Sequence, residues 1–387
     1  MRLFNTLTGR VDPFAPIGTP VRLYVCGVTP YDTTHLGHAF VYLTFDVLIR
    51  VLEAEGWTVR YVRNVTDVDD PLFERARVTG EDWQAIVQRN MAQFHRDLQQ
   101  LGARQPDVEP YVSREIAAMI ALIQTLEAGG YTYRIGERLY FRTRRFPGYG
   151  ALGGLSRAEQ LQRAKETGND PSLPGKEDPL DFLLWQPSAP DEPAWESPWG
   201  PGRPGWHIEC SAMAQRYLGD QLDLHGGGED LIFPHHASEI AQSEAASGKQ
   251  PFARFWLHCG LVRRDGVKMS KSLGNLVFTR DLLNQAGPDG VRLYLLSHHY
   301  RQGWDYNEQE LGAAQALAEQ LALLARSERP PNDHALALRD QALARLHDDL
   351  DTPAVVALLR SLVEIGTPAG AVIRELGSLL GLQFLRS

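Results

Sequence analysis

Two histidines, His35 and His38, lie three residues apart, just after a turn-forming segment. Side chains with this spacing lie on one side of a helical turn. The first turn of a helix also carries backbone N–H groups that favour phosphate. Together these groups could stabilise charge that develops on an α-phosphate, and Gly37 would let a nucleotide approach the backbone. The alternative interpretation is a pair of histidines that only caps the helix.

Two of the five lysines in the chain, Lys268 and Lys271, lie in the segment Lys268-Met269-Ser270-Lys271-Ser272. The turn signal Asp265-Gly266 precedes this segment, which therefore predicts a loop. A mobile loop with two ammonium groups is suited to stabilising a departing pyrophosphate. Taken alone the segment would indicate a solvated charged loop, but its combination with His35 and His38 favours nucleotide chemistry.

Four further side chains are of types that bind zinc: Cys26, Cys210, His235 and Glu239. They are scattered and include no Cys-x-x-Cys pair, so the pattern alone is weak, and Cys210 alone would more often be a small buried hydrophobic residue. His235 and Glu239 are spaced i, i+4 and can share one helix face. A zinc ion held by thiolates keeps an affinity for a further soft ligand, which cysteine provides and serine does not. That difference could make editing unnecessary.

The start of the chain predicts the scaffold that these residues need. Segment 21–26 is rich in β-branched and aromatic residues and predicts a buried strand. Apolar residues then recur with helical spacing, at Val41, Phe45, Leu48 and Leu52. Segment 58–65 predicts a second strand, so the three elements predict a right-handed crossover in a parallel sheet. Nucleotides bind at the carboxyl ends of such strands, where segment 26–38 falls.

The later parts of the chain predict more helices and a hairpin. Periodicity predicts helices over 81–101 and 113–128, alternation predicts a hairpin over 131–142, and the Gly- and Pro-rich stretch 146–204 predicts an irregular insertion. The chain is mostly helical beyond residue 282, where the pairs Thr352-Pro353 and Thr367-Pro368 predict the starts of two helices. We expect four parts: 1–110 and 205–280 as the two halves of a catalytic domain, 111–204 as a connective insertion, and 281–387 as a helical bundle.

The composition is that of an ordinary globular protein. The 387 residues exceed what one hydrophobic core usually serves. Hydrophobic residues make up 43% and charged residues 22%, which excludes a disordered or fibrous chain. The net charge of −9 is unsuited to sequence-independent coating of nucleic acid. Three cysteines are too few for a disulfide framework, and the N-terminus lacks the apolar core of a signal peptide, so we expect a cytoplasmic protein. No apolar run is long enough for a membrane helix, so we expect no membrane association.

The segments His35-Leu36-Gly37-His38 and Lys268–Ser272 resemble the paired signatures of the class I aminoacyl-tRNA synthetases, apart from one Leu-for-Ile exchange. The resemblance implies an α/β fold with a Rossmann-type (HUP) catalytic domain, an insertion and a C-terminal α-helical bundle. It implies ATP with Mg²⁺ as a substrate, an acyl-adenylate, and release of pyrophosphate. The catalytic residues that it implies are His35, His38, Lys268 and Lys271.

Three longer segments, 24–27, 205–210 and 225–236, resemble the cysteinyl-tRNA synthetase family, and the likeness extends from about Leu3 to about Pro353. This resemblance implies L-cysteine as the substrate and Zn²⁺ as a cofactor. The implied zinc ligands are Cys26, Cys210, His235 and Glu239. The implied contacts of the cysteinyl-adenylate are Cys26, Gly27, Val28, Thr29, Asn64, Val65, Thr66, Trp206, Gly228, Glu229, Asp230 and Val262. Cys259 matches no ligand position.

The family has two branches, which differ in the acceptor of the cysteine. One branch charges tRNA(Cys); the other forms an amide with glucosaminyl-inositol on the route to mycothiol. Segments 29–38, 64–72 and 166–171 are more similar to the amide ligase, and tRNA enzymes usually have asparagine in place of His38. We expect no anticodon-binding module after the helical part. Residues 281–387 carry 9 arginines, no lysine and 14 acids, a poor surface for RNA phosphates. We therefore expect the aminosugar-inositol acceptor.

Other residues favour the alternatives. His225 before three glycines and Glu239 as a fourth zinc ligand resemble the tRNA enzymes, so a cysteine--tRNA ligase without an anticodon-binding domain is the first alternative. An inactive paralogue that binds zinc or nucleotide is the second alternative. It predicts loss of a catalytic residue, whereas all four are present.

Asp230 and His236 are candidates for the base that deprotonates the acceptor amine. We expect a monomer.

Overall fold

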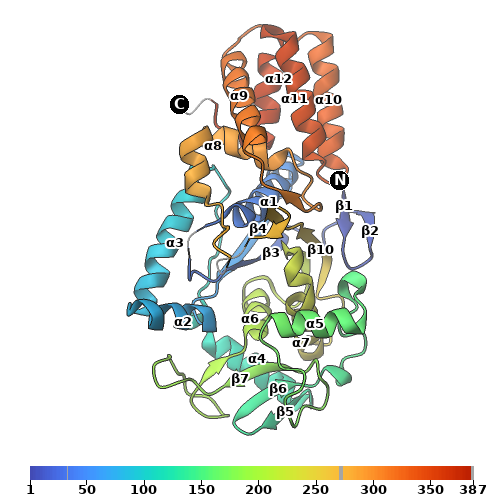
Figure 1. Ribbon diagram of the computed structural model, residues 1–387. Coiled ribbons are helices and arrows are strands. Elements are labelled where there is room, and N and C mark those ends of the chain that lie inside the picture. Colours follow the sequence, from blue (N-terminus) through green and yellow to red (C-terminus); the bar gives the residue numbers. More distant parts are fainter. Residues whose placement is uncertain (33, 270–272, 385–387) are drawn as a thin grey trace.

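The computed structural model describes residues 1–32, 34–269 and 273–384. A parallel sheet with the strand order β10-β9-β3-β4 lies at its centre (Figure 1). Its strands are β3 (Val21–Val28), β4 (Val59–Val65), β9 (Leu222–Gly228) and β10 (Ala253–Cys259). β4 lies on one side of β3 and β9 on the other, so the direction of winding reverses between β3 and β9. Sheets of this kind bind ligands outside the carboxyl ends of the strands at that reversal. The predicted α/β fold is confirmed.

The sheet separates two hydrophobic cores. α1 (Leu36–Ala54) and α6 (Trp206–Leu218) cover its two faces, and α8 (Thr279–Leu296) packs against α1. Consecutive strand residues point to opposite faces. Leu23 and Val25 accordingly pack in the core that contains α1 and α8, whereas Tyr24 and Cys26 pack in the core that contains α6. This alternation turns Cys26 toward the helix that carries Cys210.

The chain between β4 and α6 forms the left and lower parts of Figure 1. Its helices are α2 (Asp70–Thr79), α3 (Trp83–Gln100), α4 (Ile116–Ala128) and α5 (Arg157–Glu166). Its strands form one antiparallel sheet, β5 (Thr132–Ile135), β6 (Arg138–Phe141), β7 (Phe182–Gln186) and β8 (Arg203–Pro204). The hairpin predicted over 131–142 is confirmed. The prediction that 146–204 is irregular is wrong in part, because a capping box at Ser156 begins α5 and the apolar run of β7 pairs with β6.

The last part of the chain is helical, as predicted, and forms the upper part of Figure 1. After α8, it contains α9 (Glu308–Ala325), α10 (Asp333–His347), α11 (Thr352–Ile365) and α12 (Gly370–Leu379). The two Thr-Pro predictions have different outcomes. The pair Thr352-Pro353 does begin a helix, α11. Asp351, not Thr352, caps α11, because its side chain accepts a hydrogen bond from the Ala354 N–H. Thr367 begins a short 3₁₀ turn before α12.

Smaller elements complete the fold. They are the helix α7 (Ala237–Ser247), the turn η5 (Ile232–His236), the hairpin β1 (Arg2–Asn5) and β2 (Arg10–Pro13), and a small sheet of β11 (Val262–Arg264), β12 (Val267–Lys268) and β13 (Trp304–Asp305). Among the described residues, no helix has the length and apolar character needed to cross a membrane.

A buried ion pair connects α1 to the helical part. Arg292 of α8 is fully buried and donates to the carboxylate of Asp46 on α1, and also to the carbonyl oxygens of Leu101 and Leu380. Asp46 further accepts from the Arg104 N–H at 2.7 Å. A buried guanidinium needs an acidic partner, because removing that partner leaves an uncompensated positive charge in the core. The pair therefore fixes the helical part against α1, which covers the parallel sheet.

We expect Asp46→Ala to lower the free energy of unfolding by about 3–5 kcal/mol, since Arg292 would stay buried without its counter-ion. Urea denaturation followed by circular dichroism measures this change. Asp340→Ala is the matched control, because Asp340 pairs with Arg339 on the surface and should change stability by less than about 1 kcal/mol. Equal losses in the two variants would contradict the assignment.

Candidate functional site

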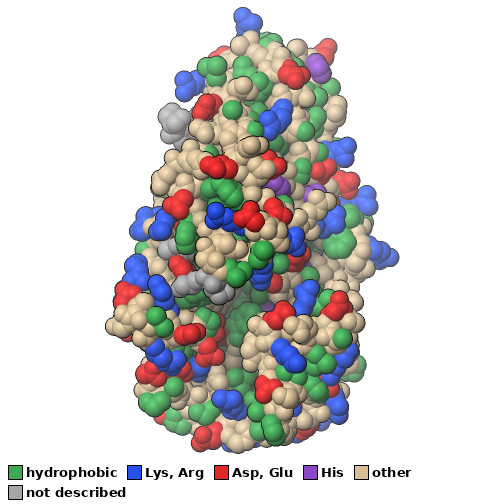
Figure 2. Space-filling view, in the orientation of Figure 1, with side chains coloured by type: hydrophobic (Ala, Val, Ile, Leu, Met, Phe, Trp, Pro, Cys, Tyr) green, Lys and Arg blue, Asp and Glu red, His purple; other side chains and the backbone are tan. Residues whose placement is uncertain are grey.

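A cavity of about 460 Å³ opens at the carboxyl ends of β3 and β9. Figure 2 shows a hollow at mid-height on the face drawn. Most of the predicted site residues line the cavity, namely Cys26, Gly27, Val28, Thr29, His35, His38, Trp206, Gly228, Asp230, Val262 and Lys268. Four predicted adenylate contacts lie outside its lining: Asn64, Val65 and Thr66 are buried at the end of β4, and Glu229 lines a neighbouring cavity of about 550 Å³. The predicted metal ligands Cys210, His235 and Glu239 are buried behind the cavity wall. Lys271 lies outside the described residues.

His35 and His38 form a stacked pair at the cavity wall, with ring centroids 3.7 Å apart. The Nδ1 atom of His35 accepts the Gly37 N–H at 3.1 Å, which leaves the ring proton on Nε2 as a donor. Burial lowers the pKa of His35 to about 4 and also lowers that of His38, so both rings are neutral at neutral pH. Among the described residues the buried Nδ1 of His38 has no hydrogen-bond partner.

The backbone of the first helical turn corrects one expectation. The N–H of Leu36 donates to the Val277 carbonyl, that of Gly37 to His35, and that of His38 to the His35 carbonyl. These N–H groups are therefore occupied, and His35 does cap the helix, as the alternative interpretation held. The imidazole rings rather than the backbone are the donors available to a phosphate.

Lys268 reaches across the cavity wall to an acidic partner. Its Nζ lies 2.9 Å from Asp230 Oδ2, and both side chains are about half exposed. An ion pair at such exposure contributes little stability. A polyphosphate that enters the cavity can therefore compete with Asp230 for the ammonium group.

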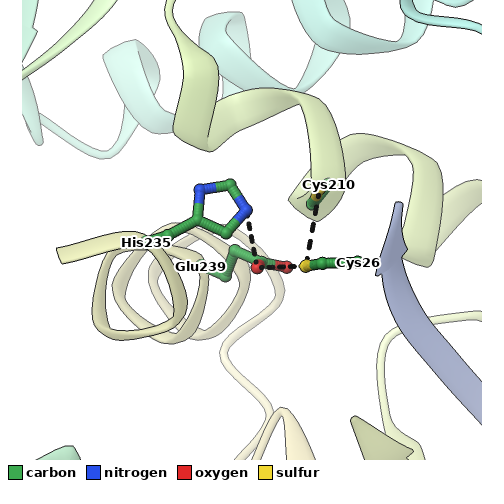
Figure 3. A group of neighbouring side chains, drawn as sticks. All are labelled: Cys26, Cys210, His235 and Glu239. Carbon is green, nitrogen blue, oxygen red and sulfur yellow. Dashed lines mark hydrogen bonds and ion pairs between the residues drawn. The ribbon is translucent and has the colours of Figure 1, made fainter. Parts of the chain in front are cut away.

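The four predicted metal ligands converge from three segments (Figure 3). Cys26 lies near the carboxyl end of β3, and Cys210 lies on α6. His235 lies in η5, and Glu239 follows one turn later in α7. All four side chains are at most 5% exposed, and their ligand atoms lie within 4.8 Å of one another.

The separations of these atoms fit a tetrahedral zinc ion. Zn–S bonds of about 2.3 Å place two sulfurs roughly 3.8 Å apart, and the Sγ atoms of Cys26 and Cys210 are 3.8 Å apart. Glu239 Oε1 lies 3.5 Å from Cys26 Sγ and 3.2 Å from His235 Nε2. Burial, together with neighbouring Cys210, raises the pKa of the Cys26 thiol. A dication in the group would oppose this effect, because thiols bind metals as thiolates.

Further histidines surround the four ligands. His207 Nδ1 lies 3.0 Å from His235 Nδ1, which leaves His235 Nε2 directed at Glu239. His225 Nε2 lies 2.9 Å from the second Glu239 oxygen. Such outer hydrogen bonds hold metal ligands in place. The sequence analysis did not identify His207 as a partner of a metal ligand, although His207 lies within segment 205–210, which carries the family resemblance.

His236 belongs to the same cluster and not to the cavity. Its Nε2 lies 3.3 Å from Cys26 Sγ, and its Nδ1 lies 2.7 Å from His258 Nε2. With Cys26, His225 and Glu239 it makes a second group whose ligand atoms lie within 4.8 Å. The first group contains both thiols, which suit zinc better. Because His236 is fully buried and both its nitrogens are engaged, its interpretation as a base for the acceptor amine is wrong.

A hydrogen-bonded chain links the metal group to the end of β4. Asn64 Oδ1 accepts the Gly27 N–H at 2.8 Å and lies 3.6 Å from Cys210 Sγ, while Asn64 Nδ2 donates to Thr66 Oγ1 at 3.1 Å. The Thr66 hydroxyl in turn donates to Glu209 Oε2 at 3.3 Å. Sequence reasoning missed Glu209. Helical spacing places Glu209 beside Trp206 and Cys210 on one face of α6, which could have indicated it.

Comparison with known proteins agrees with this geometry. The family described as "tRNA synthetases class I (C) catalytic domain" matches residues 14–316. The cysteine--tRNA ligase of Syntrophobacter fumaroxidans is 48% identical over 322 residues, which are 83% of this chain; the chain spans 64% of that protein. The L-cysteine:1D-myo-inositol 2-amino-2-deoxy-alpha-D-glucopyranoside ligase of Streptosporangium roseum is 43% identical over 392 residues, covering 99% of this chain and 95% of that protein.

Solved structures support the fold. Methionyl-tRNA synthetase of Mycobacterium tuberculosis, in complex with methionyl-adenylate, superposes with a TM-score of 0.67 over 94% of this chain and 84% of that chain, at 19% identity. At this identity the likeness bears on the fold alone.

Proposed function

This chain belongs to the class I tRNA synthetase (C) family, and from that premise we propose that it activates L-cysteine with ATP and transfers the cysteinyl group to the amine of glucosaminyl-inositol. The observation that carries the proposal is the convergence of two thiols, an imidazole and a carboxylate directly beside a cavity with the His35–His38 pair and Lys268. The four-ligand group alone would indicate a thiol substrate but no nucleotide. The His35–His38 pair with Lys268 alone would indicate a nucleotide but no thiol.

In the first step the substrate carboxylate attacks the α-phosphorus of ATP, a cysteinyl-adenylate forms, and pyrophosphate leaves. Nε2–H of His35 and the His38 ring donate to oxygens on which negative charge develops. The ammonium group of Lys268 leaves its ion pair with Asp230 and binds the departing pyrophosphate instead. By resemblance, Lys271 also binds the pyrophosphate. No nucleophile of the enzyme is needed, because the chain contributes orientation and charge.

Selection of cysteine would occur at Cys26, Cys210, His235 and Glu239. Zinc bound there supplies an affinity for a thiolate that a hydroxyl group lacks. Cys26 is part of both the ligand group and the cavity wall, so a substrate sulfur at the metal group would leave its carboxylate directed into the cavity. The buried ligand shell would hold that orientation during the attack.

In the second step the acceptor amine attacks the carbonyl carbon of the mixed anhydride, an amide forms, and AMP leaves. Asp230 lines the cavity and is 45% exposed, so it remains a candidate to take the proton of the amine. Two observations favour a small acceptor: the likeness of 29–38, 64–72 and 166–171 to the amide ligases, and the excess of acidic residues beyond Asp281. An acidic surface repels RNA phosphates.

A cysteine--tRNA ligase is the second candidate function. It is favoured by His225, which lies 2.9 Å from Glu239, and by Glu239 as a fourth ligand, since both resemble the tRNA enzymes. The first step would be the same with either acceptor.

An acceptor screen tests the proposal. Purified protein, ATP, magnesium and labelled cysteine are offered glucosaminyl-inositol in one reaction and total tRNA in another. We expect AMP release with a new cysteinyl amide in the first and no acid-precipitable cysteine in the second. Charged tRNA without amide would instead establish the second candidate. Absence of cysteine-dependent pyrophosphate exchange would remove both.

A further inference from the structure

We infer that Glu209 is a positioning residue for the α-ammonium group of the substrate, acting through the hydroxyl of Thr66, and so selects cysteine against thiol acids that lack an α-amino group. The inference rests on the proposed function. A metal site that prefers sulfur distinguishes cysteine from serine, but every thiol acid offers the same sulfur. Recognition of the ammonium group must therefore come from another part of the site.

The placement follows from the chain that begins at the metal group. Asn64 Oδ1 lies 3.6 Å from Cys210 Sγ, and Asn64 Nδ2 donates to Thr66 Oγ1. Only two carbons separate the sulfur of cysteine from its nitrogen, so a substrate whose sulfur is at the metal group places its ammonium within the reach of these polar groups. Thr66 is thus adjacent to the expected position of the ammonium.

Glu209 determines which way the Thr66 hydroxyl can act. A hydroxyl has one proton to donate and two lone pairs to accept with. The proton is directed to Glu209 Oε2 at 3.3 Å, and one lone pair accepts from Asn64 Nδ2 at 3.1 Å. The second lone pair stays available for a donor such as an ammonium group. Without Glu209 the hydroxyl could rotate and present its proton instead.

The carboxyl group of Glu209 also lacks a cationic partner among the described residues. Its side chain is 1% exposed, and within residues 1–32, 34–269 and 273–384 no cationic group lies within 4.0 Å of its carboxylate. Two neighbouring acids each accept two hydrogen bonds: Asp67 accepts from the N–H and hydroxyl of Ser113, and Asp69 accepts from the Asp70 N–H and the Thr29 hydroxyl. A buried carboxylate without a counter-ion is costly, and a bound ammonium would offset that cost.

The test compares cysteine with 3-mercaptopropionate, which is cysteine without the α-amino group. In cysteine-dependent pyrophosphate exchange, Glu209→Gln should raise KM for cysteine about 10- to 100-fold with a much smaller change in kcat, as expected for a lost charged hydrogen bond. The inhibition constant of 3-mercaptopropionate should change less than threefold, and the zinc content should be unchanged. Glu209→Asp should restore part of the affinity for cysteine.

Two further variants connect the effect to Thr66. Thr66→Val should raise KM for cysteine as Glu209→Gln does, and the double variant should be no worse than either, because residues that act through one contact are not additive. Asp67→Asn is the matched control and should leave the ratio of the two constants unchanged. Equal weakening of cysteine and 3-mercaptopropionate in Glu209→Gln would overturn the inference. Wild-type protein without cysteine-dependent exchange would instead overturn the proposed function.

Discussion

Replacing His38 by alanine is expected to slow cysteine-dependent pyrophosphate exchange by about 100- to 1,000-fold, the usual cost of losing one donor to a developing oxyanion. His38 lines the cavity, stacks on His35 and keeps a buried nitrogen without a partner among the described residues. Its lowered pKa keeps the ring neutral, so it acts as a hydrogen-bond donor and not as a fixed cation. The loss should therefore be in kcat, because this donor acts mainly on the transition state.

His334→Ala is the control, since His334 is exposed on α10, far along the chain from the cavity residues. Both variants should retain their zinc content and their midpoint of thermal unfolding. If exchange by His38→Ala equalled that of the control, His38 would have no part in adenylate formation. A rise in KM alone would reassign it to binding of ATP in the ground state.

Much of the catalytic sheet is predictable because its signals are local. The apolar run of β3, the helical spacing in α1 and the second run of β4 each reflect burial on a parallel sheet, which a short window of sequence records. The sequence also places Leu311, Leu317, Leu321 and Leu324 at helical spacing; the first three are buried and Leu324 is half-buried. Where the signal is not local, prediction fails. β7 pairs with β6, which lies more than 40 residues earlier in the sequence, and β8 then pairs with β7. Both lie within a stretch whose Gly and Pro content indicates loops.

In the candidate site, too, contacts between residues close in sequence were predictable, and contacts between distant segments were not. His35 and His38 share a helical turn, and their contact follows from their spacing. The meeting of Cys26 with Cys210 depends on which face of β3 each residue takes and on how α6 crosses that face, and only a family resemblance indicated it in advance. Glu209 was missed although its spacing places it beside Trp206 and Cys210, because a glutamate in the first turn of a helix is ordinarily explained by the helix dipole. Its burial against Thr66 is a tertiary fact.

The second large effect is expected from Cys210→Ser. Serine keeps the size of the side chain but replaces a thiolate ligand with a hydroxyl that zinc binds poorly. We expect zinc affinity to fall by more than the roughly 10- to 100-fold that outer partners of metal ligands are worth. Selectivity for cysteine over serine in pyrophosphate exchange should fall with it, because the remaining pocket distinguishes the two side chains only by size, which is worth roughly 10- to 200-fold. Zinc content by mass spectrometry and exchange with each amino acid measure the two effects separately.

Cys259→Ser provides the matched control for this change. Cys259 is also fully buried, and burial raises the pKa of its thiol, but it belongs to neither group of ligand atoms. Its replacement should therefore leave the zinc content at the wild-type value. If Cys210→Ser kept full zinc and unaltered selectivity, Cys26, His225, His236 and Glu239 would be the remaining ligand group, and the substrate sulfur would have to approach from the side of His236. The thiol preference would then not depend on Cys210, and the assignment of Cys210 as a metal ligand would be wrong.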